Sequence, residues 1–351
     1  MRYVETFLLY ARGSRDSDAA KFLRDVSEVA GRVVPSPGPG IESFERTIPE
    51  INGGWLILAS ESRGTRLITE VVEPAAAVVA FGEIFGGREE NTAKLVHDTW
   101  VTGGLDAVRV MDGCFGAAIV DRRNSTIYLV SDLLGNRSLR FLSKGGVLVA
   151  SSHDIPIVCT GLCSTEINLE SAASTLTFDW SLGGEPLLRD LSACHANEVV
   201  CWKDGLIQRT YRPLLNRDHV IDRGSHALLK EHLESMREHV IYNIRSFCDG
   251  APLVRLDLTS GLDSRSVLTV CLLAIGAERL MASTAGEAES QDVSIAGKLS
   301  ARYGFHHEHD LYQSGDYDNF ERHCRLLAFA MNGDTDGKRA ITPVPAFDET
   351  P

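Results

Sequence analysis

The feature that most constrains the fold is a short strand that runs through a turn of small residues into a helix, within residues 253–273. The apolar run 253–258 predicts the strand, and residues 266–273 continue as a helix. Such a junction leaves backbone N–H groups pointing outward at the helix start, where they and the helix dipole bind phosphate. Asp263 stands where a carboxylate could hold Mg²⁺ against that phosphate. The segment therefore predicts a nucleotide site.

A second segment, residues 102–107, has a similar string of small residues but a different context. It follows a helical pattern at 94–100 rather than a strand, and Ala107 lacks the hydroxyl group of Ser264. We interpret this second segment as a helix end followed by a turn. An ordinary strand-to-helix turn without a ligand remains the alternative for residues 259–264.

Length and charge exclude several classes of protein. The chain has 351 residues, enough for two domains, and carries a net charge of −13. Such an acidic balance argues against a nucleic-acid partner, and no apolar run approaches the length of a membrane span. The N-terminus has no signal-peptide pattern, and the eight scattered cysteines form no Cys-x-x-Cys pair. We expect a cytoplasmic protein with reduced thiols and neither nucleic-acid nor membrane partners.

Two regimes of secondary structure divide the chain near Leu215. Up to about residue 210, strand pairs such as 115–120 with 127–130 are joined by short polar turns, which predicts an α+β domain rich in antiparallel strands. After a long helix at 227–247, strands and helices alternate through residue 330, which predicts a parallel sheet. We therefore expect one domain over residues 1–215 and a second over 216–351.

The turn also resembles a known family. Residues 259–264, Thr-Ser-Gly-Leu-Asp-Ser, are similar to the Ser-Gly-Gly-x-Asp-Ser pyrophosphate loop of the asparagine synthetase family. Four more segments resemble that family in the same order, at 81–85, 111–121, 131–139 and 285–308, the last including Asp292 and His306-His307-Glu308. The resemblance implies a nucleophile-hydrolase-like sandwich of the glutaminase (class II amidotransferase) type. It implies a following α/β parallel-sheet nucleotide-binding domain, here incomplete at its C-terminal end.

The chemistry implied by the resemblance is that of an AMP-forming carbon–nitrogen ligase. ATP and Mg²⁺ would adenylate a small-molecule or peptide carboxylate, pyrophosphate would leave, and an amine would attack to give an amide. By position, the nucleotide-binding residues would be Leu258, Thr259, Ser260, Gly261, Asp263, Ser264 and Ala285. Of these, Leu258 and Ala285 would line the adenine side, Asp263 would ligate Mg²⁺, and the others would hold pyrophosphate. The resemblance assigns no catalytic side chain here.

Several positions depart from the family. Arg2 replaces the catalytic cysteine of the glutaminase, and Phe81 replaces its oxyanion asparagine, so we do not expect glutamine hydrolysis. Relatives that lost this activity include β-lactam synthetases and lasso-peptide cyclases, which close a ring with the substrate's own amine. Ser260 replaces a loop glycine, which predicts a weaker cradle where glycine's backbone freedom is required. Arg265 could contact a phosphate or pair with an acid.

The C-terminal region leaves two functions open. The family's second Mg²⁺-binding acid lies farther along its sequence, and the candidate at 332–337 comes early, after a predicted helix at 321–331. The first function is the ligase described above, without its own glutaminase. The second is a truncated or split, non-catalytic chain that acts as a nucleotide-binding or partner subunit, with a partner chain supplying the missing synthetase segment. The run 306–309 is not expected to bind a metal, because consecutive strand residues alternate faces.

Overall fold

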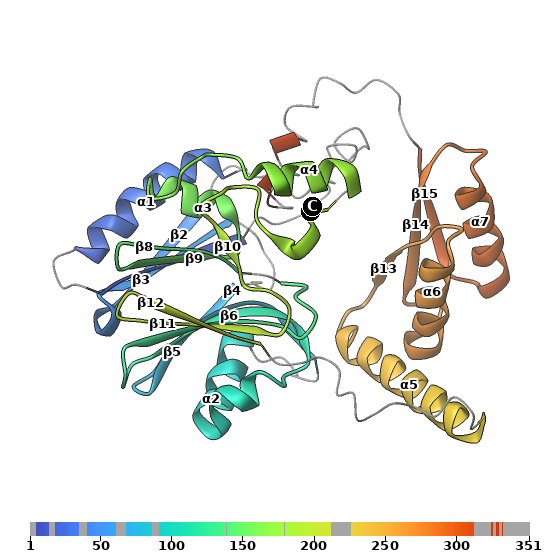
Figure 1. The fold of residues 1–351 in the computed structure, drawn as a ribbon. Helices are drawn as coiled ribbons and strands as arrows, with labels where there is room; N and C mark the ends of the chain where they lie inside the picture. The colour runs from blue at the N-terminus through green and yellow to red at the C-terminus, as the bar shows by residue number, and fades with distance from the viewer. Residues whose placement is uncertain are drawn as a thin grey trace. The chain divides into compact units, whose positions relative to one another are not determined.

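The computed structural model describes residues 5–13, 18–34, 41–60, 68–85, 91–137, 139–178, 180–211 and 226–311, with 324–325, 328–329 and 332 near the end. The chain separates into two compact units (Figure 1): residues 1–214 with 318–351 form the first, and residues 215–317 form the second. Within the described residues, no helix combines the length and apolar character that a membrane crossing requires.

Two six-stranded antiparallel sheets form the centre of the first unit. The first has the order β10-β8-β9-β1-β3-β2, with β1 (Glu5–Arg12), β2 (Ile41–Ile48), β3 (Gly53–Ser60), β8 (Arg140–Lys144), β9 (Val147–Ser151) and β10 (Ser192–Ala193). The second has the order β12-β11-β7-β6-β5-β4, with β4 (Ile68–Val72), β5 (Ala76–Ile84), β6 (Gly113–Asp121), β7 (Thr126–Ser131), β11 (Glu198–Lys203) and β12 (Leu206–Tyr211). The predicted hairpins β6–β7 and β11–β12 are confirmed.

Helices cover the outer faces of these sheets. They are α1 (Ala19–Val33), α2 (Thr92–Val108) and α3 (Asp154–Cys159). A further helix, α4 (Leu169–Phe178), contacts the short 3₁₀ turn η2 (Leu182–Gly184), and a second 3₁₀ turn is η1 (Pro49–Ile51). Phe7 and Trp202 belong to the apolar core between the two sheets, whereas Leu8, the next residue on β1, packs under α1 and α3 on the other face. A third core lies between the second sheet and α2. Period-2 alternation along the strands thus builds a four-layer sandwich.

Helix α2 corrects one prediction. Asn91 caps its first turn by accepting a hydrogen bond from the Lys94 amide at 2.7 Å, as the sequence pattern suggests. The helical course breaks at Gly104, where φ is 67° and ψ is −161°, in agreement with a helix that ends at Gly103, but helical structure then resumes as far as Val108, where the sequence predicts a turn. Glycine adopts this left-handed conformation without a Cβ penalty, so the chain can bend and then resume its helical course.

Residues near the C-terminus pack in the first unit rather than the second. Phe329 is buried in the cluster beneath α1, and its ring stacks on His153 with centroids 4.5 Å apart. The Asn332 side-chain oxygen accepts a hydrogen bond from the Asp154 amide at 3.0 Å. These positions therefore belong to a different compact unit from residues 216–317, although the sequence pattern predicts a single domain over 216–351. The described parts of the predicted helix 321–331 are helical, whereas the acids Asp334 and Asp336 lie outside the described residues.

His153 predicts how stability changes with pH. Burial, reinforced by Arg137 and Arg140, lowers its pKa from 6.5 to about 4. The unfolded chain therefore takes up the proton first, and the free energy of unfolding should fall by about 3 kcal/mol as pH drops from 6.5 to 4. His153→Gln should remove most of this slope, as measured by urea unfolding across that window. Parallel slopes for the two chains would contradict the assignment.

The second unit is a parallel α/β structure. Its strands are β13 (Val254–Asp257), β14 (Leu280–Gly286) and β15 (His306–Leu311), paired in parallel in that order. Its helices are α5 (His226–Phe247), α6 (Leu262–Ile275) and α7 (Gln291–Tyr303). Apolar side chains from the helices and strands, including Cys271, Leu280 and Ala296, form one core together with Leu258 and Phe305 from the connections. The predicted change from antiparallel to parallel strands is confirmed, and so is the coarse fold class.

Candidate functional site

The loop between β13 and α6 lies at the carboxyl end of the parallel sheet (Figure 1). In open parallel sheets this is the edge at which ligands bind. Helix α6 begins at Leu262 after Gly261, and no side chain caps its N-terminus. The predicted residues Thr259, Ser260, Gly261, Asp263 and Ser264 are all in this loop and the first helical turn.

The uncapped start of α6 presents backbone donors. The Arg265 amide donates to the Gly261 carbonyl at 3.4 Å, as expected for the first full helical turn. The amides of Leu262, Asp263 and Ser264 have no acceptor among the residues that the structure describes. Three free N–H groups at the positive end of a helix dipole form a site suited to an anion.

Hydroxyl groups hold the turn in shape. The Thr259 amide donates to Ser264 Oγ at 3.1 Å, and the two hydroxyl oxygens are 3.0 Å apart. The Gly261 amide donates to Thr259 Oγ1 at 3.1 Å. Thr259 and Ser264 therefore stabilise the loop internally, and the amides of Thr259 and Gly261 are engaged within the turn.

A carboxylate from the next helix holds Ser260. The Ser260 amide donates to Asp292 Oδ1 at 2.7 Å, and hydrogen bonding by the Ser260 side chain and amide keeps the pKa of Asp292 below its ordinary value. Ser260 is not among the described residues with positive φ, and Gly261 has φ −63°. The backbone therefore does not require glycine at position 260, and the expected weakening does not arise from backbone strain. No local sequence pattern signals this contact, which spans 32 positions.

Asp263 is the candidate metal ligand. Its side chain is exposed in the first turn of α6, and within the described residues it has no hydrogen-bond or ion-pair partner. Mg²⁺ typically binds one or two carboxylates and completes its shell with phosphate oxygens and water. A free carboxylate beside three free amides fits that requirement. No group of three or more potential ligands occurs in the part of the chain that the structure describes.

Arg265 makes a contact that neither sequence alternative named. Its Nε donates to the Gly261 carbonyl at 3.1 Å, so the guanidinium braces the loop backbone. This bond leaves the outer nitrogens at the protein surface, because the residue is exposed. The guanidinium therefore adds positive charge beside the loop.

The two predicted adenine-side residues differ in exposure. The Leu258 side chain is buried in the core of the second unit, while its amide donates to the Ser283 carbonyl and its carbonyl accepts from Thr284 Oγ1 at 2.7 Å. Ala285 is exposed on β14, opposite Asp310 of β15. Ala285 therefore lies on the strand next to the loop, whereas the side chain of Leu258 lies in the core beneath the loop.

The histidines on β15 are engaged by the sheet. His307 Nε2 lies 2.9 Å from Thr284 Oγ1, whose single proton is directed at the Leu258 carbonyl, so the histidine nitrogen is the donor. Burial and the neighbouring histidines lower the pKa of His307, which favours this neutral form. His309 Nε2 lies 3.1 Å from the Gly286 carbonyl. Both rings therefore make contacts within the unit.

Phe81 and Gly82, which lie in the segment that resembles the glutaminase, have structural roles. Phe81 lies in the core between the sheets, where its ring contacts that of Phe7. Gly82 has φ 89°, and a Cβ there would lie 2.1 Å from the Cys114 carbonyl oxygen, so a larger residue does not fit. Arg2 lies outside the described residues. The phenyl ring offers no side-chain donor for an oxyanion at position 81.

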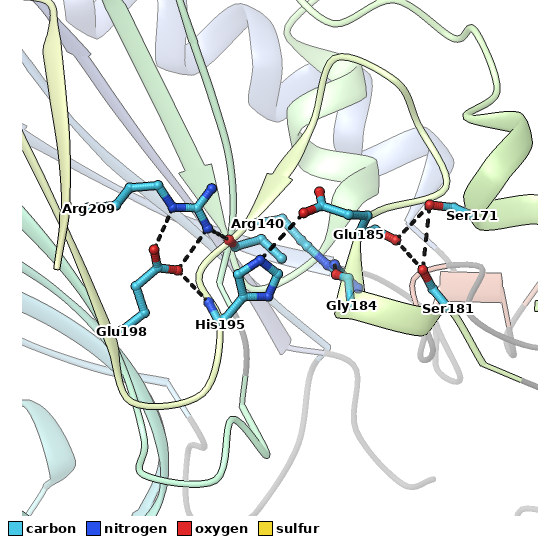
Figure 2. A network of polar contacts seen from close by, with 9 residues as sticks. Arg140, Ser171, Ser181, Gly184, Glu185, His195, Glu198 and Arg209 are labelled. Atoms are coloured by element: carbon cyan, nitrogen blue, oxygen red, sulfur yellow. Dashed lines mark hydrogen bonds and ion pairs between the residues drawn. The ribbon is translucent and has the colours of Figure 1, made fainter. Parts of the chain in front are cut away.

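A polar network links β11 and β12 to the residues around η2 (Figure 2). Arg209 binds both carboxylate oxygens of Glu198, whose side chain is 0% exposed, and the His195 amide donates to the same carboxylate at 2.7 Å. The imidazole of His195 interacts with the carboxylate of Glu185, at 3.5 Å from Nε2, rather than with the thiol of the neighbouring Cys194. Burial raises the pKa of the Cys194 thiol, so this cysteine is not a reactive nucleophile. The network fixes local structure.

No protein-family model matches the sequence, and no curated protein matches it. Among solved structures, glutamine phosphoribosylpyrophosphate amidotransferase from B. subtilis, complexed with ADP and GMP, has a TM-score of 0.36 and 11% identity over 90% of this chain and 67% of that chain. The allosteric regulatory enzyme of purine biosynthesis has a TM-score of 0.39 and 9% identity, over 88% and 80%. Glutamine-dependent NAD⁺ synthetase from Acinetobacter baumannii, in complex with ADP, has a TM-score of 0.23 and 18% identity, over 46% and 34%.

Proposed function

We propose that this chain is an asparagine-synthetase-like ligase that uses ATP and Mg²⁺ to adenylate a carboxylate and form an amide, without hydrolysing glutamine itself. The observation that carries the proposal is the uncapped start of α6, where three free amides lie beside the unpaired carboxylate of Asp263. The position of this loop at the carboxyl end of a parallel sheet supports the same function.

Each loop residue has a distinct part in this proposal. The amides of Leu262, Asp263 and Ser264 would bind the departing pyrophosphate, and the Asp263 carboxylate would hold Mg²⁺. When bound, the metal ion would supply positive charge against the charge that develops on the leaving group. Ser260 would act through Asp292, which fixes its backbone, and Ala285 would line the nucleotide from the neighbouring strand. The acid substrate would be a small molecule or a peptide.

The second candidate is a nucleotide-binding subunit that needs a partner chain for catalysis. Within the described residues, β13 and β15 each pair only with β14, so both edges of the three-stranded parallel sheet have unpaired backbone groups. Such an edge accepts a strand from another chain. A partner that adds a strand beside β13 would also bring new side chains to the carboxyl end of the sheet.

Position 262 offers a direct test of the amide cradle. Proline is tolerated at the first position of a helix, and Gly261, with φ −63° and ψ 152°, already has the extended conformation that precedes proline. Leu262→Pro therefore removes one free amide and leaves the helix intact. We expect it to weaken binding of ATP with Mg²⁺ by at least about tenfold, the worth of one hydrogen bond to a charged group. Isothermal titration calorimetry on the full chain measures this change.

Leu262→Ala is the matched control. It removes the same side chain, which is 72% exposed, but keeps the amide, so ATP affinity should stay close to that of the wild type. Equal ATP affinity in the proline and alanine variants would show that the Leu262 amide does not contribute to ATP binding. A wild-type chain that binds no ATP would refute both candidate functions.

A further inference from the structure

Among the residues that the structure describes, the N-terminal end of helix α5 carries an exposed apolar stripe. Every residue from 226 to 240 is exposed, whereas the helix becomes partly buried from residue 241, where Ile244 packs against the core of the second unit. Leu229, Leu233, Met236 and Val240 are 37%, 52%, 60% and 40% exposed. A helix rarely stays formed in water over such a length by propensity alone, because most helical stability comes from packing.

The spacing of these four residues is that of a coiled-coil seam. Their separations of four, three and four positions place them along one stripe, about 17 Å long at the rise of an α-helix. We call Leu229, Leu233, Met236 and Val240 the α5 seam. The stripe is continuous with the buried face around Ile244 (α5, Figure 1), so a helix packed on it would extend an existing apolar core.

The charges beside the seam are arranged by sign. Lys230 and Arg237 flank one side, and His232 and His239 flank the other, while the acidic residues of this segment, Glu231, Glu234 and Glu238, lie away from the seam. Lys230 has one weak contact with Glu234, at 3.9 Å between exposed groups. The flanking positions, which face a partner helix in a coiled coil, are therefore cationic or neutral.

The charges beside the α5 seam indicate which kind of helix could bind there. A second copy of α5 would oppose Lys230 and Arg237 to each other in an antiparallel pairing, which is repulsive, and to the histidines in a parallel pairing, which supplies no opposite charge. A helix with glutamate or aspartate at its flanking positions would instead meet the opposite charges of Lys230 and Arg237 on one side, and hydrogen-bond donors of the histidines on the other. We propose that the α5 seam binds an amphipathic helix with acidic flanks from another protein. This inference does not depend on the nucleotide site.

Two synthetic peptides test the proposal on the full chain. Both have about three heptads with the same leucine seam, and they differ only in carrying glutamate or lysine at the flanking positions. By fluorescence anisotropy at an ionic strength of about 0.15 M, we expect the glutamate peptide to bind about tenfold more tightly, since several weak ion pairs add up to one such factor. Leu233→Asp should abolish this binding while circular dichroism shows an unchanged fold, because Leu233 is exposed.

Charge variants separate the local effect from net charge. Lys230→Glu combined with Arg237→Glu should reverse the preference, so that the lysine peptide binds more tightly. Glu231→Lys combined with Glu238→Lys changes net charge by an equal amount in the opposite direction, on the opposite face, and should leave both affinities unchanged. Equal binding of the two peptides, binding of neither, or self-association of the chain that Leu233→Asp abolishes would each overturn the proposal.

Discussion

In the Asp263→Asn variant, release of pyrophosphate from ATP and Mg²⁺ is expected to fall at least about 100-fold below that of the wild type. The asparagine side chain has nearly the same shape but no negative charge, so it is a poor Mg²⁺ ligand. Asp263 is exposed and has no partner among the described residues, so its replacement should not disturb the fold. A coupled colorimetric assay for pyrophosphate, with candidate acids and amines supplied, measures the change.

Glu278→Gln is the control for this experiment. Glu278 is an exposed carboxylate of the same unit, but it precedes β14 and so lies at the amino edge of the sheet, opposite the loop. Its replacement should leave release unchanged. Unaltered release in Asp263→Asn would refute the metal role of Asp263. A wild-type chain that binds ATP with Mg²⁺ but releases no pyrophosphate would favour the partner-subunit function over the ligase.

Arg209→Met is expected to lower the free energy of unfolding by about 3 kcal/mol, because it leaves the buried carboxylate of Glu198 without its counter-ion. Burial alone would raise the pKa of Glu198, but hydrogen bonds from Arg209 and from the His195 amide hold it below its ordinary value. Without the guanidinium the carboxylate must take up a proton or remain charged in the protein interior. Urea unfolding followed by circular dichroism measures the loss.

Two further variants serve as controls for this result. Arg189→Met removes an arginine from an ion pair with Glu166 in which both side chains are more than half exposed, and it should cost less than about 1 kcal/mol. Glu198→Gln combined with Arg209→Met removes the buried charge as well, so it should recover part of the lost stability. A loss in Arg209→Met no larger than that in Arg189→Met would contradict the account of Glu198.

Local sequence patterns predicted much of the fold. Alternation and polar turns predicted the β6–β7 and β11–β12 hairpins, and the strand, turn and helix at 253–273 correspond to β13, the loop and α6. These features depend on residues close together in the chain. The helical residues after the break at Gly104 were not predicted, because the sequence shows where a helix can break but not whether it resumes.

Contacts between distant residues could not be predicted from pattern. The bond from the Ser260 amide to Asp292 joins the loop before α6 to α7 and depends on how α7 follows β14, which no local motif encodes. The sequence resemblance placed Asp292 in the right helix without its role at the loop. The burial of Glu198 is similar, since its partner Arg209 becomes visible only when β11 pairs with β12. The roles of the loop residues toward a nucleotide remain predictions.

The stacking of Phe329 on His153 has a consequence for the covalent architecture of the chain. The polypeptide leaves the first unit, forms the second, and returns to the first, so the second unit is an insertion rather than an appended module. A single protease cut in either connection would therefore leave the inserted unit attached through the other, and only two cuts would release it. A gene fragment that ends after β15 would lose a piece of the first unit's core along with its tail.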